Sequence, residues 1–90
     1  MSKGSKAPAR RLVNVYVNES TNELLLSYAC GRAPLTYYIY DENMHPVMCG
    51  KGVIDERGLF VISMETFLSG EYSIEIDVNG NIYNNSFYKY

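Results

Sequence analysis

Hydrophobic and polar residues alternate along much of the chain, most clearly over residues 71–78. The apolar positions are Tyr72, Ile74, Ile76 and Val78, and the polar ones are Glu71, Ser73, Glu75 and Asp77. Because successive side chains of a strand point to opposite faces, this pattern predicts a strand with one buried face and one solvated, acidic face. Asn79-Gly80 follows, and this dipeptide is typical of a two-residue hairpin turn.

A two-residue turn determines how the last segment of the chain pairs with this strand. The expected partners are Val78 with Asn81, Ile76 with Tyr83, Ile74 with Asn85, and Tyr72 with Phe87. Tyr83 and Phe87 then lie inside, and Ile82 and Tyr88 outside. Asn85 also lands inside, where an amide without a partner costs roughly 1–3 kcal/mol. We therefore expect Asn85 to bond to backbone or, preferably, a bulge around Asn84-Asn85 that resets the alternation.

Five further segments are rich in residues that favour strands: 11–18, 23–29, 35–40, 47–49 and 59–63. In the first of them Val13, Val15 and Val17 form the buried face. In the second the buried set is either Leu24, Leu26 and Tyr28, or Leu25 with Ser27. Gly50 and Gly52 are expected to twist or bulge the short fourth segment, and residues 64–69 form a helical turn or a loop.

About seven strands, with turn signals at roughly 8–12-residue intervals, predict an all-β fold. The pattern favours an antiparallel, immunoglobulin-like sandwich, and a small barrel is the alternative closure. Residues 1–10 are expected to form a disordered tail or linker, and residues 11–90 a single domain. Tyr72 has the position of a tyrosine corner, in which the hydroxyl bonds to upstream backbone; the alternative is that Tyr72 is only the first core residue of its strand.

The charge is distributed unevenly. The whole chain has a net charge of −2, but half of its eight basic residues lie before residue 12, leaving four basic against ten acidic residues in 12–90, a net of −6. A body this acidic repels phosphate backbones, so the sequence argues against nucleic-acid binding. Nor does any apolar run approach the ~20 residues of a membrane span.

The residues that could carry chemistry are few. Cys30 and Cys49 could form a disulfide, although two free, partly buried thiols are the favoured interpretation. His45, before Pro46, is interpreted as a turn residue rather than as the base of a catalytic pair with Cys49. The acidic groups near residues 41 and 55 lack the ligand spacing of a calcium loop. The sequence therefore predicts no catalytic residue, no metal site and no cofactor.

Nine tyrosines and no tryptophan are unusual in a chain of this length. Tyr38, Tyr40, Tyr88 and Tyr90 fall on outward-facing positions of the predicted strands. An exposed patch of these residues could stack on sugar rings or contact a protein partner. The alternative is that a second layer or a loop covers them.

Two segments carry a resemblance to known proteins. Residues 35–47, LTYYIYDENMHPV, and 68–78, LSGEYSIEIDV, followed by a terminal strand over 80–90, resemble small immunoglobulin-like sandwich domains of unknown function in secreted proteins of Bacteroides-type gut bacteria. They are also similar to the C-terminal sorting domains of related bacteria. The chain departs from the pattern at residues 43–46, which replace the usual glycine turn. The resemblance implies a removed leader, a secreted, periplasmic or cell-surface location, and an interaction role.

These observations lead to one expected function and one alternative. The first is a non-enzymatic binding or accessory module, monomeric or weakly dimeric, with a protein or glycan partner. Its contact surface would be the tyrosine-bearing face or a sheet edge open to strand addition. The alternative is a small secreted protease inhibitor that presents the loop at residues 41–46.

Overall fold

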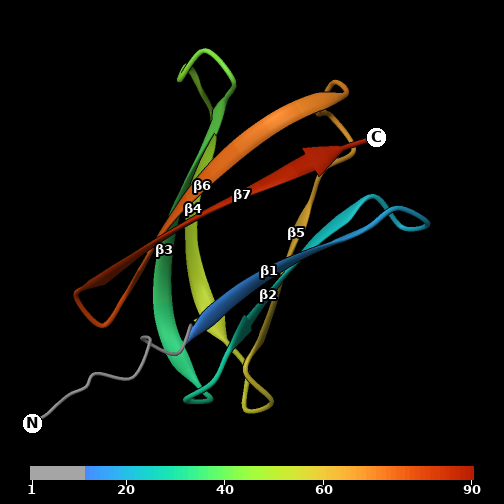
Figure 1. Ribbon diagram of the computed structural model, residues 1–90. Coiled ribbons are helices and arrows are strands. Elements are labelled where there is room, and N and C mark those ends of the chain that lie inside the picture. The colour runs from blue at the N-terminus through green and yellow to red at the C-terminus, as the bar shows by residue number, and fades with distance from the viewer. Residues whose placement is uncertain (1–11) are drawn as a thin grey trace, which may run out of the picture.

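The computed structural model describes residues 12–90, which form seven strands (Figure 1). The strands are β1 (Val13–Asn18), β2 (Glu23–Tyr28), β3 (Ala33–Asp41), β4 (Pro46–Ile54), β5 (Leu59–Ser63), β6 (Gly70–Val78) and β7 (Asn81–Lys89). The predicted tail at residues 1–10 lies outside the described residues. Within residues 12–90 there is no helix, and therefore none long and apolar enough to cross a membrane.

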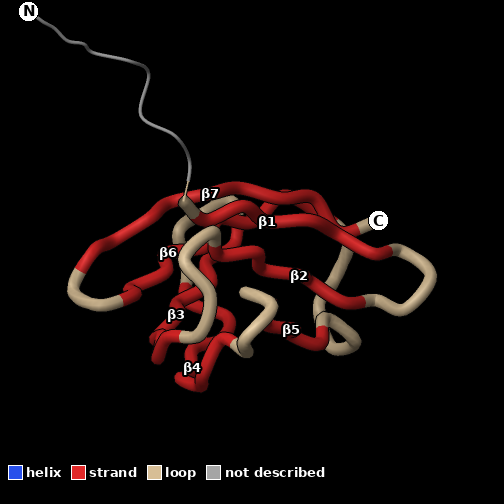
Figure 2. The backbone as a smooth tube through the Cα atoms, turned by 90° about the horizontal axis from the view of Figure 1, so that it is seen from below, coloured by secondary structure: helices blue, strands red, loops and turns tan. Residues whose placement is uncertain are grey.

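The strands form two antiparallel sheets that pack face to face, so the fold is a sandwich rather than a barrel. One sheet has the order β1-β2-β5 and the other β4-β3-β6-β7. Figures 1 and 2 show β1 lying beside β7, where the margins of the two sheets meet. The residues between strands form turns and short loops, including 64–69, where a helical turn was one expectation. This arrangement is that of an immunoglobulin-like sandwich, in which β2 and β5 oppose β3 and β6.

The core consists of the inward-facing residues of both sheets, as the alternation predicted. Leu24, Ile39 and Ile76 are completely buried, and they come from the central strands β2, β3 and β6. In β2 the buried set is Leu24, Leu26 and Tyr28, which decides between the two alternatives. Leu25 instead lies on the outer face and is only half-buried.

The β6–β7 hairpin has the predicted register but not the predicted bulge. Pairing runs without interruption from Gly70 with Lys89 to Val78 with Asn81. Asn85 stays opposite Ile74, facing inward, and is half-buried. Because β7 is the last strand of its sheet, an inward position on it is not fully enclosed, and an amide is tolerated there without a change of register.

β4 is the strand that the sequence described least well. It is one continuous strand of nine residues, and Gly50 and Gly52 do not interrupt it. The irregularity falls elsewhere: β3 pairs Ile39 with Met48 and Tyr40 with Pro46, so that Val47 is passed over. The glycines make room for two rings, because a Cβ on Gly50 would lie 2.8 Å from the Tyr37 hydroxyl and one on Gly52 2.6 Å from the Phe60 ring, so that either ring would have to shift.

Tyr72 forms the tyrosine corner that was one of its two interpretations. Its hydroxyl donates a hydrogen bond of 2.6 Å to the carbonyl oxygen of Leu68. Its ring lies between those of Phe67 and Phe87, with centroid distances of 5.0 and 5.5 Å. The loop between β5 and β6 is therefore held against the sheet by one partly buried hydrogen bond and by the packing of three rings, stacked for Tyr72 and Phe87 and tilted for Phe67 and Tyr72.

We expect Tyr72→Phe to lower the free energy of unfolding by about 1 kcal/mol, because the hydroxyl is lost while the ring stack remains. Urea denaturation would measure this as a lower midpoint with an unchanged slope. Tyr16→Phe is the matched control, since Tyr16 is 55% exposed on the other sheet. Equal midpoints for the wild-type protein and Tyr72→Phe would show that the corner contributes nothing to stability.

Candidate functional site

The hairpin tip between β3 and β4 is organised by Asp41. Its Oδ1 atom accepts hydrogen bonds from the backbone N–H groups of Asn43 and His45, both at 2.9 Å. Its backbone N–H and carbonyl bond to the His45 carbonyl and the Met44 N–H, also at 2.9 Å. The turn is thus closed by four hydrogen bonds to one residue, and the tip is held in a single shape.

The turn between β4 and β5 is built in the same way around Asp55. Its Oδ1 atom accepts from the backbone of Arg57 at 2.9 Å and of Leu59 at 3.0 Å, and the fourth residue of the turn is Gly58. Gly58 has a φ of 82° and its counterpart Met44 a φ of 63°, so both lie in the left-handed region. Such a φ suits glycine, but for a side chain such as that of methionine it costs roughly 1–2 kcal/mol.

The two turns have the same backbone shape, but the residue at the left-handed position is constrained differently in each. A Cβ on Gly58 would overlap the backbone carbonyl oxygen of Tyr28, so only glycine fits there. Met44 has no such neighbour forcing its identity, and its side chain is 64% exposed. A strained, exposed apolar residue at a rigid tip is a feature often found at functional sites.

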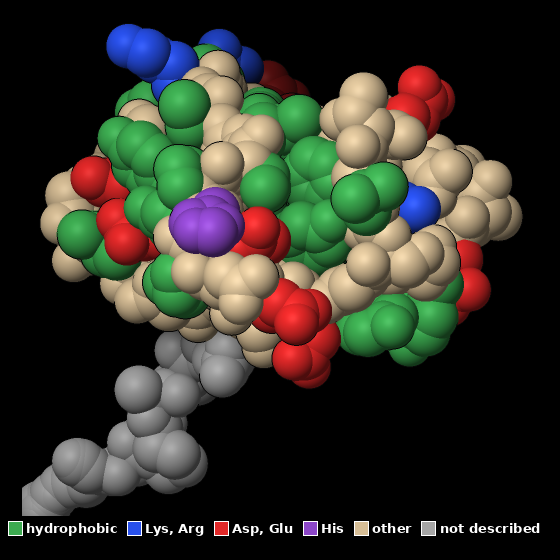
Figure 3. All heavy atoms as spheres, turned by 90° about the horizontal axis from the view of Figure 1, so that it is seen from above, with side chains coloured by type: hydrophobic (Ala, Val, Ile, Leu, Met, Phe, Trp, Pro, Cys, Tyr) green, Lys and Arg blue, Asp and Glu red, His purple; other side chains and the backbone are tan. Residues whose placement is uncertain are grey.

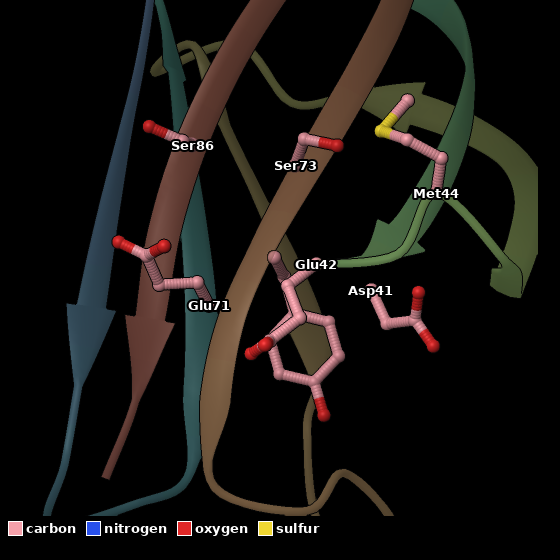
Figure 4. Close-up of a pocket in the computed structure, with 7 residues that line it drawn as sticks. Asp41, Glu42, Met44, Glu71, Ser73 and Ser86 are labelled. Carbon is pink, nitrogen blue, oxygen red and sulfur yellow. The ribbon is translucent and has the colours of Figure 1, made fainter.

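A hollow of about 250 Å³ lies beside this tip (Figure 4). Its lining residues are Asp41, Glu42, Met44, Glu71, Tyr72, Ser73 and Ser86. Figure 4 shows that they come from the hairpin tip, from β6 and from β7. Ser73 and Ser86 are paired across β6 and β7, and Tyr40 on β3 pairs with Ser73 from the other side. One row across the sheet thus holds a tyrosine and two serines.

The four tyrosines that were predicted to face outward all lie on this side of the molecule, in two pairs. Tyr38 and Tyr40 lie on the outer face of β3, whereas Tyr88 lies on that of β7, opposite Glu71. Tyr90 follows β7, and its ring packs against that of Tyr88 at a centroid distance of 4.9 Å. Tyr38, Tyr88 and Tyr90 are 40%, 45% and 68% exposed, so the rest of the described chain does not cover them.

The strand between the two pairs is acidic. β6 presents Glu71, Ser73, Glu75 and Asp77 on its outer face, and Glu75 lies directly opposite Tyr38. The end of the molecule around the tip, seen in Figure 3, also shows acidic and hydrophobic side chains intermixed around His45. The four tyrosines therefore form an interrupted aromatic surface with carboxylates between its halves. We call the outer face of β3, β6 and β7 with these tyrosines the tyrosine face.

The two cysteines are free, which was the favoured interpretation, but both are exposed and not partly buried as expected. Cys30 lies in the turn before β3, whereas Cys49 lies within β4, five residues from the Ile54 that pairs with the start of β3. Five residues of strand span about 16 Å, more than twice the ~7 Å between Cα atoms that a disulfide can bridge.

Each thiol lies near a tyrosine of the sandwich interior. Burial raises the pKa of Tyr28, and the neighbouring Cys30 adds to that increase, while Asn79 acts in the opposite direction. Burial likewise raises the pKa of Tyr37, with a smaller contribution from Cys49. Both phenols therefore stay neutral at physiological pH.

His45 is a residue of the turn, as interpreted from the sequence. Its Nδ1 atom lies 3.7 Å from Oδ2 of Asp41, and its side chain is 76% exposed. Within residues 12–90, no three His, Cys, Asp or Glu side chains are grouped so that they could hold a metal ion.

Sequence reasoning missed two parts of this site. It did not place Ser73 and Ser86 together, because that depends on the β6–β7 register extending past Asn85 without a bulge. It also grouped the acidic residues of 41–43 and 55–56 only as possible calcium ligands and did not predict that the two segments form the same kind of turn. A signal was present, since both begin with Asp-Glu, and the left-handed Gly58 corresponds to Met44.

Comparison with known proteins identifies the fold. No family model matches the chain, and no curated protein matches it either. Among solved structures, the chain is similar to a DUF3244 family protein from Bacteroides vulgatus described as having an immunoglobulin-like β-sandwich fold. The TM-score is 0.69 at 21% identity, over 88% of this chain and 84% of that one. The protein is thus an immunoglobulin-like sandwich, and its resemblance to Bacteroides domains of unknown function holds in three dimensions.

We expect Met44→Gly to raise the free energy of unfolding by about 0.5–1 kcal/mol, because relief of the left-handed strain outweighs the greater freedom of glycine in the unfolded chain. The urea midpoint would increase correspondingly. Met44→Ala is the control, since it removes the side chain but keeps the strain. An increase of the same size in Met44→Ala would mean that the side chain, and not the backbone, is unfavourable.

We also expect Asp55 to make the free energy of unfolding depend on pH in the acidic range. The backbone N–H of Leu59, followed by the Arg57 side chain at 2.9 Å, holds the pKa of Asp55 below its ordinary value of 3.8. A carboxylate whose pKa is lowered by folding stabilises the fold above its ordinary pKa and loses that contribution as the pH falls through the folded-state pKa. Asp55→Asn keeps an acceptor for the turn but no charge to protonate.

Urea midpoints measured between pH 5 and pH 3 should therefore fall less steeply for Asp55→Asn than for the wild-type protein. Glu56→Gln, in the same turn, is the control and should leave the wild-type slope unchanged. Parallel curves for the wild-type protein and Asp55→Asn would contradict the assigned role of Asp55.

Proposed function

We propose that this protein is a non-enzymatic binding module, working outside the cytoplasm as its resemblance to secreted domains implies, and that the tyrosine face recognises a neutral oligosaccharide. The observation that supports this is the combination of three exposed tyrosines (Tyr38, Tyr88 and Tyr90) and the half-buried Tyr40 with a hollow lined by Ser73 and Ser86. Aromatic faces offer apolar area for stacking, and hydroxyl and carboxylate groups beside them offer hydrogen bonds that fix orientation.

The dimensions and charge of the surface favour this ligand class. Tyr40 and Ser86 lie two strand spacings apart, roughly 10 Å, and Tyr88 lies one row further towards the hairpin tip. This span suits a short oligosaccharide better than a single sugar ring. The carboxylates of Glu71 and Glu75 accept hydrogen bonds from sugar hydroxyls but repel acidic glycans.

The loop at residues 41–46 is less well suited to the alternative function of protease inhibition. Its chain reverses direction between Asp41 and His45, where two backbone hydrogen bonds close the turn. Proteases bind the segment they cleave in an extended conformation, so this turn would first have to open.

The test is a thermal-unfolding and calorimetric screen against neutral oligosaccharides of glucose, mannose, galactose and N-acetylglucosamine, with a protease panel alongside. A ligand at about 100 times its dissociation constant adds roughly 2.7 kcal/mol, a shift of several degrees for a domain of this size. For the oligosaccharide that binds, Tyr38→Ala and Tyr88→Ala should each weaken affinity about fivefold or more.

Tyr16→Ala is the matched control, because Tyr16 is also an exposed strand tyrosine but lies on the other sheet. It should bind like the wild-type protein. Equal losses in Tyr16→Ala and Tyr38→Ala would remove the tyrosine face from the binding site. Stoichiometric inhibition of a protease, with no response to any glycan, would replace the proposal by the alternative.

A further inference from the structure

The two sheets have four marginal strands, and β4 differs from the other three. β1 and β7 lie beside each other, as Figures 1 and 2 show, so each protects the other's edge. β5 is only five residues long. β4 is nine residues long and pairs only with β3, which leaves a row of backbone N–H and C=O groups on its other side. Exposed edges of this length are the sites at which extended peptides add to sheets.

Between Met48 and Ile54 this edge has one of the features that normally prevent strand addition, the exposed Lys51, and no others. Pro46 and the irregularity at Val47 lie at its beginning. From Met48 to Ile54 the pairing with β3 is regular, and this stretch contains no proline. Its only charged residue, Lys51, is exposed and pairs with Thr36 on the outer face. No inward-pointing charge protects the edge.

The surface next to the edge is aromatic. The ring of Tyr37 lies under Gly50 and that of Phe60, from β5, under Gly52. The two rings are 6.0 Å apart and both residues are only half-buried. Since glycine contributes no side chain, the rings lie directly against the backbone of β4 and stay partly exposed. Alternate side chains of an added strand would therefore meet an apolar surface.

A hollow of about 250 Å³ lies at the beginning of β4. Its lining residues are Asp41, Val47, Thr66, Phe67, Leu68 and Tyr72. Val47 is 43% exposed and Leu68 81%, so two apolar side chains at this position face solvent. The hollow and the two rings together give an extended segment both an apolar anchor point and a row of contacts.

We propose that the free edge of β4, from Met48 to Ile54, binds an extended segment of a partner protein as an added strand, with an apolar side chain of that segment in the hollow beside Val47 and Leu68. The exposed backbone groups of β4 pair with those of the segment. Apolar side chains at alternate positions cover Tyr37 and Phe60. Its hollow shares Asp41 and Tyr72 with the hollow lined by Ser73 and Ser86, but the edge of β4 and the rings of Tyr37 and Phe60 are not part of the tyrosine face. The inference therefore does not depend on the oligosaccharide proposal.

Charge indicates which kind of segment binds and argues against a second copy of this chain. Residues 12–90 have a net charge of −6, and Asp41 borders the hollow. Two such bodies repel each other, whereas a segment with basic residues between its apolar positions is attracted to the acidic body. Lys51 is the exception on the edge itself, so the residue of the segment opposite Lys51 is uncharged. The occupant is therefore a segment of alternating apolar and basic or uncharged residues, without acidic ones.

The probe is a capped, fluorescent nine-residue peptide of alternating valine and lysine, used with the full chain. Two comparison peptides replace lysine by glutamate or carry a methyl group on every backbone nitrogen. Anisotropy should show binding of the lysine peptide and at least tenfold weaker binding of the other two. Hydrogen exchange should slow at least tenfold for amides within residues 48–54 and stay unchanged in β7.

Val47→Lys should weaken binding of the lysine peptide about fivefold or more, because it removes part of the apolar hollow and adds a like charge. Val61→Lys is the matched control, since Val61 is 47% exposed on the outer face of the other sheet, and it should bind like the wild-type protein. Tyr38→Ala should also leave peptide binding unchanged, which separates this surface from the tyrosine face.

Four results would overturn the proposal. They are no binding at about 1 mM peptide, undiminished binding of the methylated peptide, protection that appears in a strand other than β4, and binding of the glutamate peptide as tight as that of the lysine peptide. A dimer detected by sedimentation and abolished by Val47→Lys would assign the edge to a second copy instead.

Discussion

The two hollows beside the β3–β4 hairpin tip both depend on Tyr72. Its hydroxyl ties the β5–β6 loop to the sheet through the Leu68 carbonyl, and its ring is packed between two phenylalanines. The same residue pairs with Asp41, the residue that closes the hairpin tip. It consequently lines both hollows, the one on the tyrosine face and the one beside the β4 edge. Tyr72 thus joins the β5–β6 loop through its side chain and the β3–β4 hairpin through its position in the sheet.

The two Asp-Glu turns show how one local structure can serve different purposes. Around Asp55 the left-handed position must be glycine, because the backbone of Tyr28 fills the space that a side chain would need. Around Asp41 the corresponding residue is Met44, exposed and strained. Stability alone would favour glycine at both positions. The departure from that rule occurs where the turn borders a hollow rather than where it packs against the core.

Charge distinguishes the partners that these surfaces can accept. The described residues are strongly acidic, and the carboxylates of β6 separate the two tyrosine pairs. An acidic surface repels phosphate backbones and acidic glycans. The surfaces differ in the kind of contact they offer. The tyrosine face presents side chains to a ligand, whereas β4 presents its backbone.

The sequence by itself determined the strands and the side of each that is buried. Period-two alternation places Ile74 and Ile76 inside whatever lies opposite them, and Asn79-Gly80 sets the register of its hairpin, because both effects act within a few residues. It also identified the four outward tyrosines and allowed the tyrosine corner. Only the tertiary structure decided the features that involve segments far apart in the sequence. Gly50 and Gly52 lie inside a continuous β4, where the rings of Tyr37 from β3 and Phe60 from β5 occupy the space that side chains would need. Asn85 keeps its place because β7 is marginal in its sheet, and the cysteines remain apart because the sheet separates them. No local pattern records such contacts, since each depends on residues that are brought together only when the two sheets pack.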